Sequence, residues 1–291
     1  MKKQLLLLLV TISVIGFSCK KIDFPLPKKL CQIKQVVRNG GPTVSGTFDY
    51  EYNNERLLSK LTLTFGLQEI LTFEYDNQDR PVIFHKGNFG TDYLIYQNNL
   101  LIRVDRFENN GQLLDQVFLA YDNRKRLIER KGNVMGFVLT RYEYEGHSKN
   151  PKRKLLFRQP VAAAVSKGLD KGVNQSDEQE LQLQIIYEYK YDNKINPQAT
   201  LIGQPLSPYY FGQEFTIDQY EPIPENNIVY QKFLGLSGGT SFNYMEYFIT
   251  YEYDNHYPVK ENHKKVFHNP IPGVPPQEIF ATATYVYECK N

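Results

Sequence analysis

A short pattern of alternating aromatic and polar residues recurs along the chain. Its clearest copy reads FEYDN at positions 73–77, and related copies begin at positions 50, 120, 142, 187, 251 and 285. Alternation with a period of two predicts a β-strand with one aromatic face and one polar face. The Asp-Asn pair that closes several copies favours a turn, because both side chains bond their own backbone and tolerate left-handed angles. The repeated unit is therefore predicted to be a β-hairpin.

The spacing of the copies indicates a true repeat. The last strand tyrosines of five successive copies lie 23, 21, 25 and 23 residues apart, at Tyr52, Tyr75, Tyr96, Tyr121 and Tyr144. A unit of about 23 residues holds two strands of about eight residues and two turns. The strand preference of tyrosine alone does not produce such regular spacing. We therefore expect one all-β domain over residues 30–291, an antiparallel meander of hairpins that forms a curled sheet or a closed barrel.

Two stretches break this rhythm, near 149–184 and 197–227. The first is rich in basic and small residues, and we expect an insertion or a long loop with a short helix near 161–167. The second contains five prolines, and we expect its aromatic run at 209–211 to cap an open end of the sheet. Strands are predicted again at 228–233, 244–253, 259–267 and 279–288.

The first 29 residues have the pattern of a secretion signal and a tether. Residues 5–15 carry no charge, and this run is too short to cross a bilayer, which takes about 20 residues. The signal ends in GFSC, which resembles the lipobox of bacterial lipoproteins, although Gly16 stands where leucine is usual. The resemblance implies removal of residues 1–18, acylation of Cys19, and a tether over residues 19–29. An ordinary secretory signal with an unrelated cysteine is the alternative.

Such an anchor implies attachment to an outer membrane, facing either the periplasm or the cell surface. Lys20 and Lys21 follow the cysteine, whereas surface-exposed lipoproteins often carry acidic residues there, so the periplasmic side is favoured. The formal net charge is only +2, from 34 basic and 32 acidic residues scattered along the chain. This balance argues against a nucleic-acid partner.

Glutamates lie opposite the tyrosines in the predicted strands, at Glu51, Glu74, Glu143, Glu188 and Glu252. In a soluble barrel the aromatic face points inward, whereas in a membrane barrel it faces lipid. The lipoprotein signal and the Lys290-Asn291 end favour the soluble barrel, because membrane barrels usually finish on an aromatic residue. We therefore interpret the glutamates as a solvated or lumenal face and not as an acid–base pair.

The sequence contains no recognisable catalytic or metal-binding motif. The five histidines are His85, His147, His256, His263 and His268. None belongs to an H-E-x-x-H motif, and the last two, five residues apart on a strand, are expected to face opposite sides. Neither a G-x-S-x-G motif nor a phosphate-binding glycine loop occurs. Asp76, Asp122 and Asp254 are predicted to form turns, and their spacing does not support calcium binding. We predict no catalytic residue, no metal site and no cofactor.

Three cysteines are present, and acylation uses Cys19. Cys31 lies at the start of the first predicted strand and Cys289 at the end of the last. If the first and last strands meet, these residues become neighbours in an oxidising compartment and are expected to form a disulfide. The alternative is an open sheet with one reduced thiol on each edge strand.

Parts of the chain resemble known repeat families. The run YDNRKRL at 121–127 resembles the YD repeat of Rhs-type proteins, Y-D-x-x-G-R-L, with Lys125 in place of the glycine and Asp79 in that place one copy earlier. Losing the glycine costs about 1 kcal/mol per turn if the left-handed angle is kept, so a different loop geometry is expected. The blocks at 191–197, 225–228, 251–258 and 285–289 resemble Bacteroidota lipoproteins of an unknown-function domain family with a porin-like β fold. That resemblance implies a cell-envelope location and carries over no catalytic residue.

Three hypotheses for the function follow. The first is a non-enzymatic cell-envelope binding or scaffold lipoprotein, whose amphipathic surface suits glycans, peptides or other envelope proteins. The second is a carrier that holds a lipid or another apolar ligand inside the curled sheet. The third is a hydrolase whose site is assembled only by folding. An apolar cavity above about 300 Å³ favours the carrier. A cleft that joins a histidine to a carboxylate and a hydroxyl favours the enzyme. A filled core with exposed aromatic side chains favours the scaffold.

Overall fold

The structure is a computed structural model of the whole chain. It describes residues 31–40, 45–134, 137–159, 181–200, 206–207, 210–211, 217–218, 220–237, 240–268 and 273–289. The predicted signal, Cys19, the tether and the helix near 161–167 lie outside the described residues.

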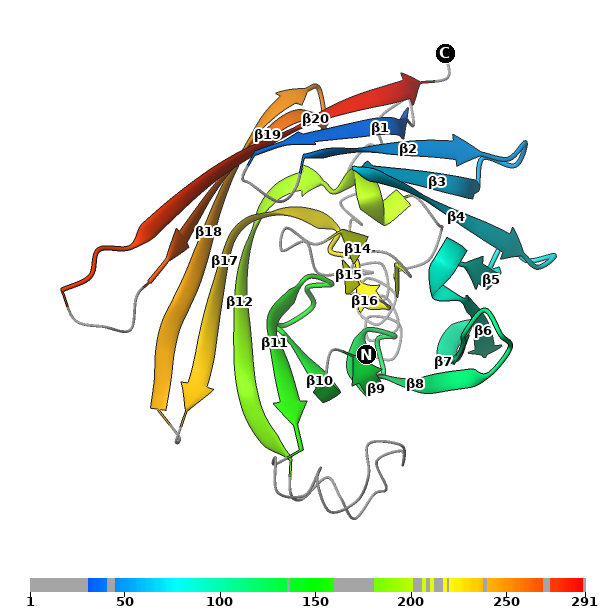
Figure 1. The fold of residues 1–291 in the computed structure, drawn as a ribbon, viewed down its shortest axis with the longest axis horizontal. Helices are drawn as coiled ribbons and strands as arrows, with labels where there is room; N and C mark the ends of the chain where they lie inside the picture. The colour runs from blue at the N-terminus through cyan, green and yellow to red at the C-terminus, as the bar shows by residue number, and fades with distance from the viewer. Residues whose placement is uncertain are drawn as a thin grey trace, which may run out of the picture. The chain divides into compact units, whose positions relative to one another are not determined.

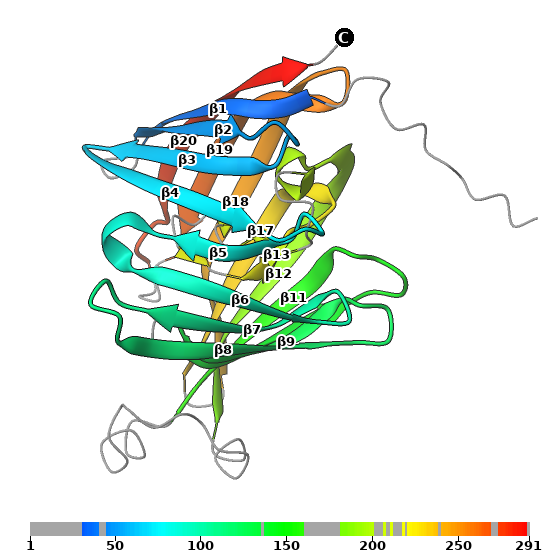
Figure 2. The same cartoon turned by 90° about the vertical axis from the view of Figure 1, so that its right-hand side faces the viewer.

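Sixteen antiparallel strands form a closed barrel, each paired with the next along the chain (Figures 1 and 2). The predicted all-β meander is confirmed, and the sheet closes. Nine strands make its first part: β1 (Cys31–Asn39), β2 (Gly46–Tyr52), β3 (Leu58–Phe65), β4 (Leu67–Tyr75), β5 (Pro81–His85), β6 (Thr91–Gln97), β7 (Leu100–Phe107), β8 (Leu113–Tyr121) and β9 (Leu127–Val134). Seven complete it: β10 (Phe137–Tyr144), β11 (Pro151–Arg158), β12 (Gln182–Ile195), β17 (Asn226–Ser237), β18 (Thr240–Asp254), β19 (Tyr257–Phe267) and β20 (Gln277–Cys289).

The remaining elements are short. A 3₁₀ turn, η1 (Gly87–Phe89), joins β5 to β6. Between β12 and β17 lie η3 (Pro197–Thr200), β13 (Leu206–Ser207), β14 (Tyr210–Phe211), β15 (Ile217–Asp218) and β16 (Glu221–Pro222). One prediction needs correction, because the stretch expected to be irregular at 149–184 contains β11 and the start of β12. The charged residues of β11 hide its alternation, in which Lys154 and Leu156 are buried.

The alternation along each strand sorts side chains between the lumen and the outer wall. In β2, Phe48 and Tyr50 are buried, whereas Glu51 is exposed and pairs across the strands with Lys60 at 2.8 Å. Similar outer pairs join Lys260 to Glu252 and Arg153 to Glu188. The aromatic face therefore points inward, as predicted for a soluble barrel. These ion pairs place charged side chains on the outer wall.

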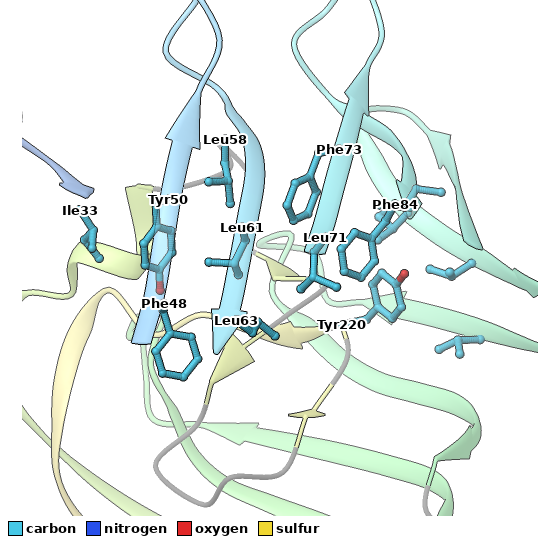
Figure 3. Packing of buried hydrophobic residues seen from close by; sticks show 14 of the residues in the cluster. Ile33, Phe48, Tyr50, Leu58, Leu61, Leu63, Leu71, Phe73, Phe84 and Tyr220 are labelled. Carbon is cyan, nitrogen blue, oxygen red and sulfur yellow. The ribbon is translucent and has the colours of Figure 1, made fainter. Parts of the chain in front are cut away.

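The buried face of the first nine strands packs into one hydrophobic core. Leu61, Leu71 and Phe84 are almost completely buried there, and Tyr220 from the segment between β12 and β17 packs into the same cluster (Figure 3). Phe73 stacks on Phe84 with ring centroids 4.8 Å apart. Burying each such side chain contributes about 1.5–3 kcal/mol, so this part of the lumen is filled with side chains that stabilise the barrel.

The repeated tyrosines fasten one end of the barrel, which we call the tyrosine end. A tyrosine near the end of a strand, the last one in every case except Tyr251, donates its hydroxyl proton to a backbone carbonyl near the start of the neighbouring strand. Such bonds of 2.7–3.0 Å join Tyr52 to Ile33, Tyr75 to Leu58, Tyr96 to Pro81, Tyr121 to Leu101, Tyr144 to Leu127, Tyr191 to Pro151, Tyr251 to Ile228 and Tyr287 to Pro258. Strands that no turn connects at this end are thus joined by a tyrosine, which gives the repeat a structural role.

The turns at the tyrosine end keep the angle that glycine usually supplies. Asp79 and Lys125 have φ values of 58° and 62°, so the expectation of a different loop geometry is wrong. The aspartate that opens each of these two turns accepts two backbone N–H groups and an arginine side chain: Asp122 accepts from the backbone of Arg124 and Arg126 and from the side chain of Arg126. These bonds hold the left-handed residue in place and offset its cost of about 1 kcal/mol.

The two terminal strands of the barrel are linked covalently. Cys31 and Cys289 are joined by the predicted disulfide. The backbone N–H of Cys31 also donates to the hydroxyl of Tyr257 at 3.2 Å. In the chain-entropy model a bond that closes so long a loop contributes about 5 kcal/mol.

Candidate functional site

Short elements between β12 and β17 lie inside the barrel. We call the described residues between 196 and 225 the plug segment; its elements β14, β15 and β16 lie within the ring of strands (Figure 1). Two adjacent residues of this segment, Tyr220 and Glu221, are buried and contact the inner wall. The predicted cap at 209–211 stays a prediction, because the side chains of these residues lie outside those that the structure describes.

Tyr220 closes the first of two buried polar clusters. Its hydroxyl donates to Asp92 Oδ2 at 2.6 Å, and Lys86 Nζ lies 2.6 Å from Asp92 Oδ1. Burial lowers the pKa of Lys86, although Asp92 opposes that shift. Burial and the neighbouring Asp92 together raise the pKa of Tyr220, so its hydroxyl keeps its proton and donates. The cluster therefore pairs the buried cation Lys86 with the buried anion Asp92. The hydroxyl of Tyr220, from the plug segment, is its third member.

Glu221 forms the second cluster. Arg130 lies 2.9 Å and Lys154 lies 3.3 Å from Glu221 Oε1, and Arg130 also donates to the hydroxyl of Thr140 at 3.0 Å. All four side chains are buried. Because desolvation offsets much of the attraction in buried ion pairs, such clusters fix a geometry more than they add stability. The two clusters therefore set the position of the plug segment against β6, β9 and β11.

One histidine lies beside a buried carboxylate and a hydroxyl. His263 Nε2 is 3.2 Å from Glu261 Oε1, and Tyr285 donates to the same carboxylate. Burial raises the pKa of Glu261, but the bonds from His263 and Tyr285 and the charge of Arg38 hold it below its usual value. The carboxylate is the central member here, whereas in a nucleophile–base–acid relay the histidine is central. The arrangement neutralises a buried anion and does not constitute a relay.

The other histidine pairs lie on the outer wall. His85 contacts Glu74 at 2.9 Å and His268 contacts Glu246 at 2.7 Å. His263 and His268 thus use opposite faces, as predicted. Within the described residues, no group of three or more His, Cys, Asp or Glu side chains is placed to hold a metal ion.

A row of aromatic and lysine side chains lies on the outside of the barrel. Strand register places Lys190, Tyr230, Phe248, Lys264 and Phe280 side by side across five neighbouring strands, and we call these residues the outer row. Phe248 and Phe280 are 41% and 62% exposed, although large apolar side chains are usually buried. The ring of Tyr230 lies 5.3 Å from that of Phe248.

Sequence reasoning missed the outer row. Its residues are spread from position 190 to position 280, and each strand contributes only one of them. The available signal was the break in alternation at Phe248 and Phe280, which stand where the pattern places polar residues. Only the strand register shows that these exceptions line up.

The architecture defines a closed, antiparallel sixteen-stranded β-barrel with a partly filled lumen. A solved porin-like protein from Bacteroides uniformis ATCC 8492 has a similar fold, with a TM-score of 0.52, 11% identity, and coverage of 88% of this chain and 96% of that one. At this identity the likeness shows the fold.

Two solved toxin assemblies also match. The Photorhabdus luminescens Tc holotoxin pore has a TM-score of 0.30 and 11% identity over 78% of this chain, and the TcdB2-TccC3-TEV structure has 0.29 and 10% over 81%. The aligned regions are 13% and 15% of those much longer chains. No protein-family model and no curated protein matches the chain. Among the described residues, no helix is long and apolar enough to cross a membrane.

Proposed function

We propose that this protein is a non-enzymatic binding or scaffold module of the cell envelope that engages its partner through the outer wall of the barrel. The observation that carries the proposal is the distribution of apolar side chains. Inside, Leu71, Phe84 and Tyr220 are fully buried, whereas outside Phe248 and Phe280 are exposed in one row. Aromatic side chains held rigidly on strands suit recognition, because they lose little conformational freedom on binding.

The carrier and hydrolase hypotheses have less support. A carrier needs lumenal space, and the hydrophobic cluster, which includes Tyr220, occupies the inner face of the first nine strands. A hydrolase needs an accessible nucleophile and base, and the Glu261 cluster is buried with its carboxylate in the centre.

The anchor and the location belong to the same proposal. Acylation of Cys19 attaches the chain to the outer membrane, with the barrel facing the periplasm or the cell surface. The first strand begins with Cys31 at the tyrosine end of the barrel. The porin-like fold of the Bacteroides protein is in keeping with an envelope location.

In-cell photo-crosslinking tests the proposal. A photoreactive phenylalanine replaces Phe280 in the outer row or, as the matched control, Phe118, which is 47% exposed on β8 at the far side of the ring. We expect a crosslinked adduct at position 280 and none at position 118. No adduct at position 280, or equal adducts at both positions, contradicts binding through the outer row.

A second measurement addresses the carrier. The purified protein is extracted with organic solvent, and the extract is analysed by mass spectrometry. Recovery of one apolar molecule per chain, apart from the acyl chains on Cys19, favours the carrier and overturns the proposal.

A further inference from the structure

The outer row is a straight strip of side chains perpendicular to the strands. Lys190 pairs with Tyr230, Tyr230 with Phe248, Phe248 with Lys264, and Lys264 with Phe280. Neighbouring strands lie about 4.8 Å apart, so the row extends over roughly 19 Å and its two phenylalanines are about 10 Å apart. Lys190 lies over the ring of Tyr230, with its Nζ 5.1 Å from the centroid.

Polar side chains border the row on both sides. One border contains Thr250, Asn262 and Thr282, which are aligned with one another by register. The other contains Glu188, Lys232, Glu246 and Glu278, with the buried Val266 between the last two, aligned in the same way. A ligand that lies along the row therefore meets aromatic rings and two lysine side chains beneath it and hydrogen-bonding groups at both edges.

The charges around the row balance. The row and the charged border together hold three lysines and three glutamates, and Lys264 pairs with Glu278 at 2.7 Å. Such a surface offers no excess charge to an anionic lipid headgroup or an acidic polymer. An apolar membrane surface also fits poorly, because docking on it desolvates both polar borders without replacing their hydrogen bonds.

We propose that the outer row binds an extended, uncharged glycan chain. The faces of sugar rings carry C–H groups that pack on aromatic rings, and their hydroxyls project sideways to hydrogen-bond with the borders. The separation of the two phenylalanines is comparable to the advance of a disaccharide unit, so both contact the same chain. This inference rests on the proposed function and specifies the chemical class of the partner.

Affinity electrophoresis tests the inference with defined probes. The full chain is run in native gels that contain galactomannan, xyloglucan, mixed-linkage β-glucan or dextran, and in gels that contain polygalacturonate or alginate as anionic probes. We expect at least one neutral polysaccharide to retard the wild-type protein. Phe248→Ala and Phe280→Ala should each weaken that binding about tenfold, because each removes one aromatic contact, while Phe118→Ala should bind as the wild type does.

A second variant keeps the aromatic surface intact. The chain contains no tryptophan, so Phe280→Trp places a single fluorescent reporter in the row. Its emission should shift on titration with the polysaccharide that retards the wild type, and an unchanged emission at saturation overturns the inference.

The remaining outcomes are also decisive. Retardation by no neutral polysaccharide, retardation by anionic probes alone, or equal loss in Phe118→Ala overturns glycan binding by the row. A protein adduct at position 280 without sugar binding overturns this inference but leaves the proposed function standing. Absence of both sugar binding and an adduct overturns both.

Discussion

The hydroxyl of Tyr220 donates a 2.6 Å hydrogen bond to Asp92, which lies 128 residues earlier in the chain. Neither residue has exposed surface. The bond therefore joins the plug segment to the inner wall in a place that water does not reach. Loss of either partner leaves a buried polar group without compensation.

The first prediction concerns this bond. Tyr220→Phe keeps the ring in the core and removes only the hydroxyl, so we expect the free energy of unfolding to fall by about 1–3 kcal/mol. Urea denaturation followed by circular dichroism measures it. Tyr93→Phe is the matched control, because Tyr93 is 44% exposed and adjacent to Asp92, and its effect should stay within about 0.5 kcal/mol. Equal effects of the two substitutions contradict the role given to Tyr220.

Replacing Asp92, the other partner, should lower the free energy of unfolding by more than Tyr220→Phe does. Asp92→Asn leaves the Lys86 ammonium buried without its counterion, and breaking a buried pair in this way typically costs about 3–5 kcal/mol. The same denaturation experiment measures the loss. If Asp92→Asn lowers the free energy of unfolding by less than Tyr220→Phe does, another group solvates the Lys86 ammonium. That result contradicts the described cluster.

The turn aspartates predict a specific dependence on pH. Hydrogen bonds from Arg80 hold the pKa of Asp76 below its usual value. Partial burial opposes the shift at Asp122, but bonds from Arg126 and Arg124 lower its pKa as well. A carboxyl whose pKa is lower in the folded state adds stability above its unfolded pKa of about 3.9, and this stability is lost as the pH falls through the folded pKa.

The test compares two variants across pH. The double variant Asp76→Asn, Asp122→Asn should be less stable than the wild type at pH 7 by about 1 kcal/mol or more, and the difference should shrink below about pH 4. Asp254→Asn is the control, because Asp254 accepts from Asn255 instead of an arginine. A difference that does not vary with pH rules out the charge-assisted bonds as its source.

The disulfide predicts a stabilised seam between β1 and β20. Replacing Cys31 and Cys289 by serine should lower the free energy of unfolding by about 2–5 kcal/mol, and adding reductant to the wild type should have the same effect. Hydrogen exchange should quicken first in these two strands. If an alkylating reagent modifies both cysteines in the native oxidised protein, the disulfide does not exist.

The next prediction concerns acylation of Cys19 and does not depend on the barrel fold. Cys19→Ala should abolish incorporation of a palmitate analogue in the producing cells, whereas Cys31→Ala should retain it. Persistent labelling of Cys19→Ala refutes acylation at this residue.

Local sequence signals predicted most of the barrel. The alternation placed Phe48 and Tyr50 inside and Glu51 outside, because side-chain direction in a strand depends only on parity. The spacing of the tyrosines predicted the hairpins. The sequence left a curled sheet and a closed barrel open, and it predicted the Cys31–Cys289 disulfide on the condition that the terminal strands meet. Each of these features is encoded within a short stretch or at the chain ends.

The features that were missed depend on contacts between distant residues. The left-handed angle of Lys125 is the local exception: the YD pattern places glycine there, and the bonds that Asp122 accepts keep the same angle without glycine. Tyr220 resembles any other tyrosine until the plug segment is folded against Asp92. The outer row likewise exists only through the register of five strands.

The central claim is that the lumen beside the plug segment is filled and that the outer wall carries the accessible aromatic side chains. Hydroxyl-radical footprinting of the native protein tests this claim most directly. Mass spectrometry then compares oxidation rates at Phe248 and Phe280 with those at Tyr220 and Phe84. We predict rapid oxidation of the first pair and strong protection of the second, because the first is exposed and the second fully buried. Oxidation of Tyr220 and Phe84 as fast as Phe280 would mean an open lumen and contradict the account.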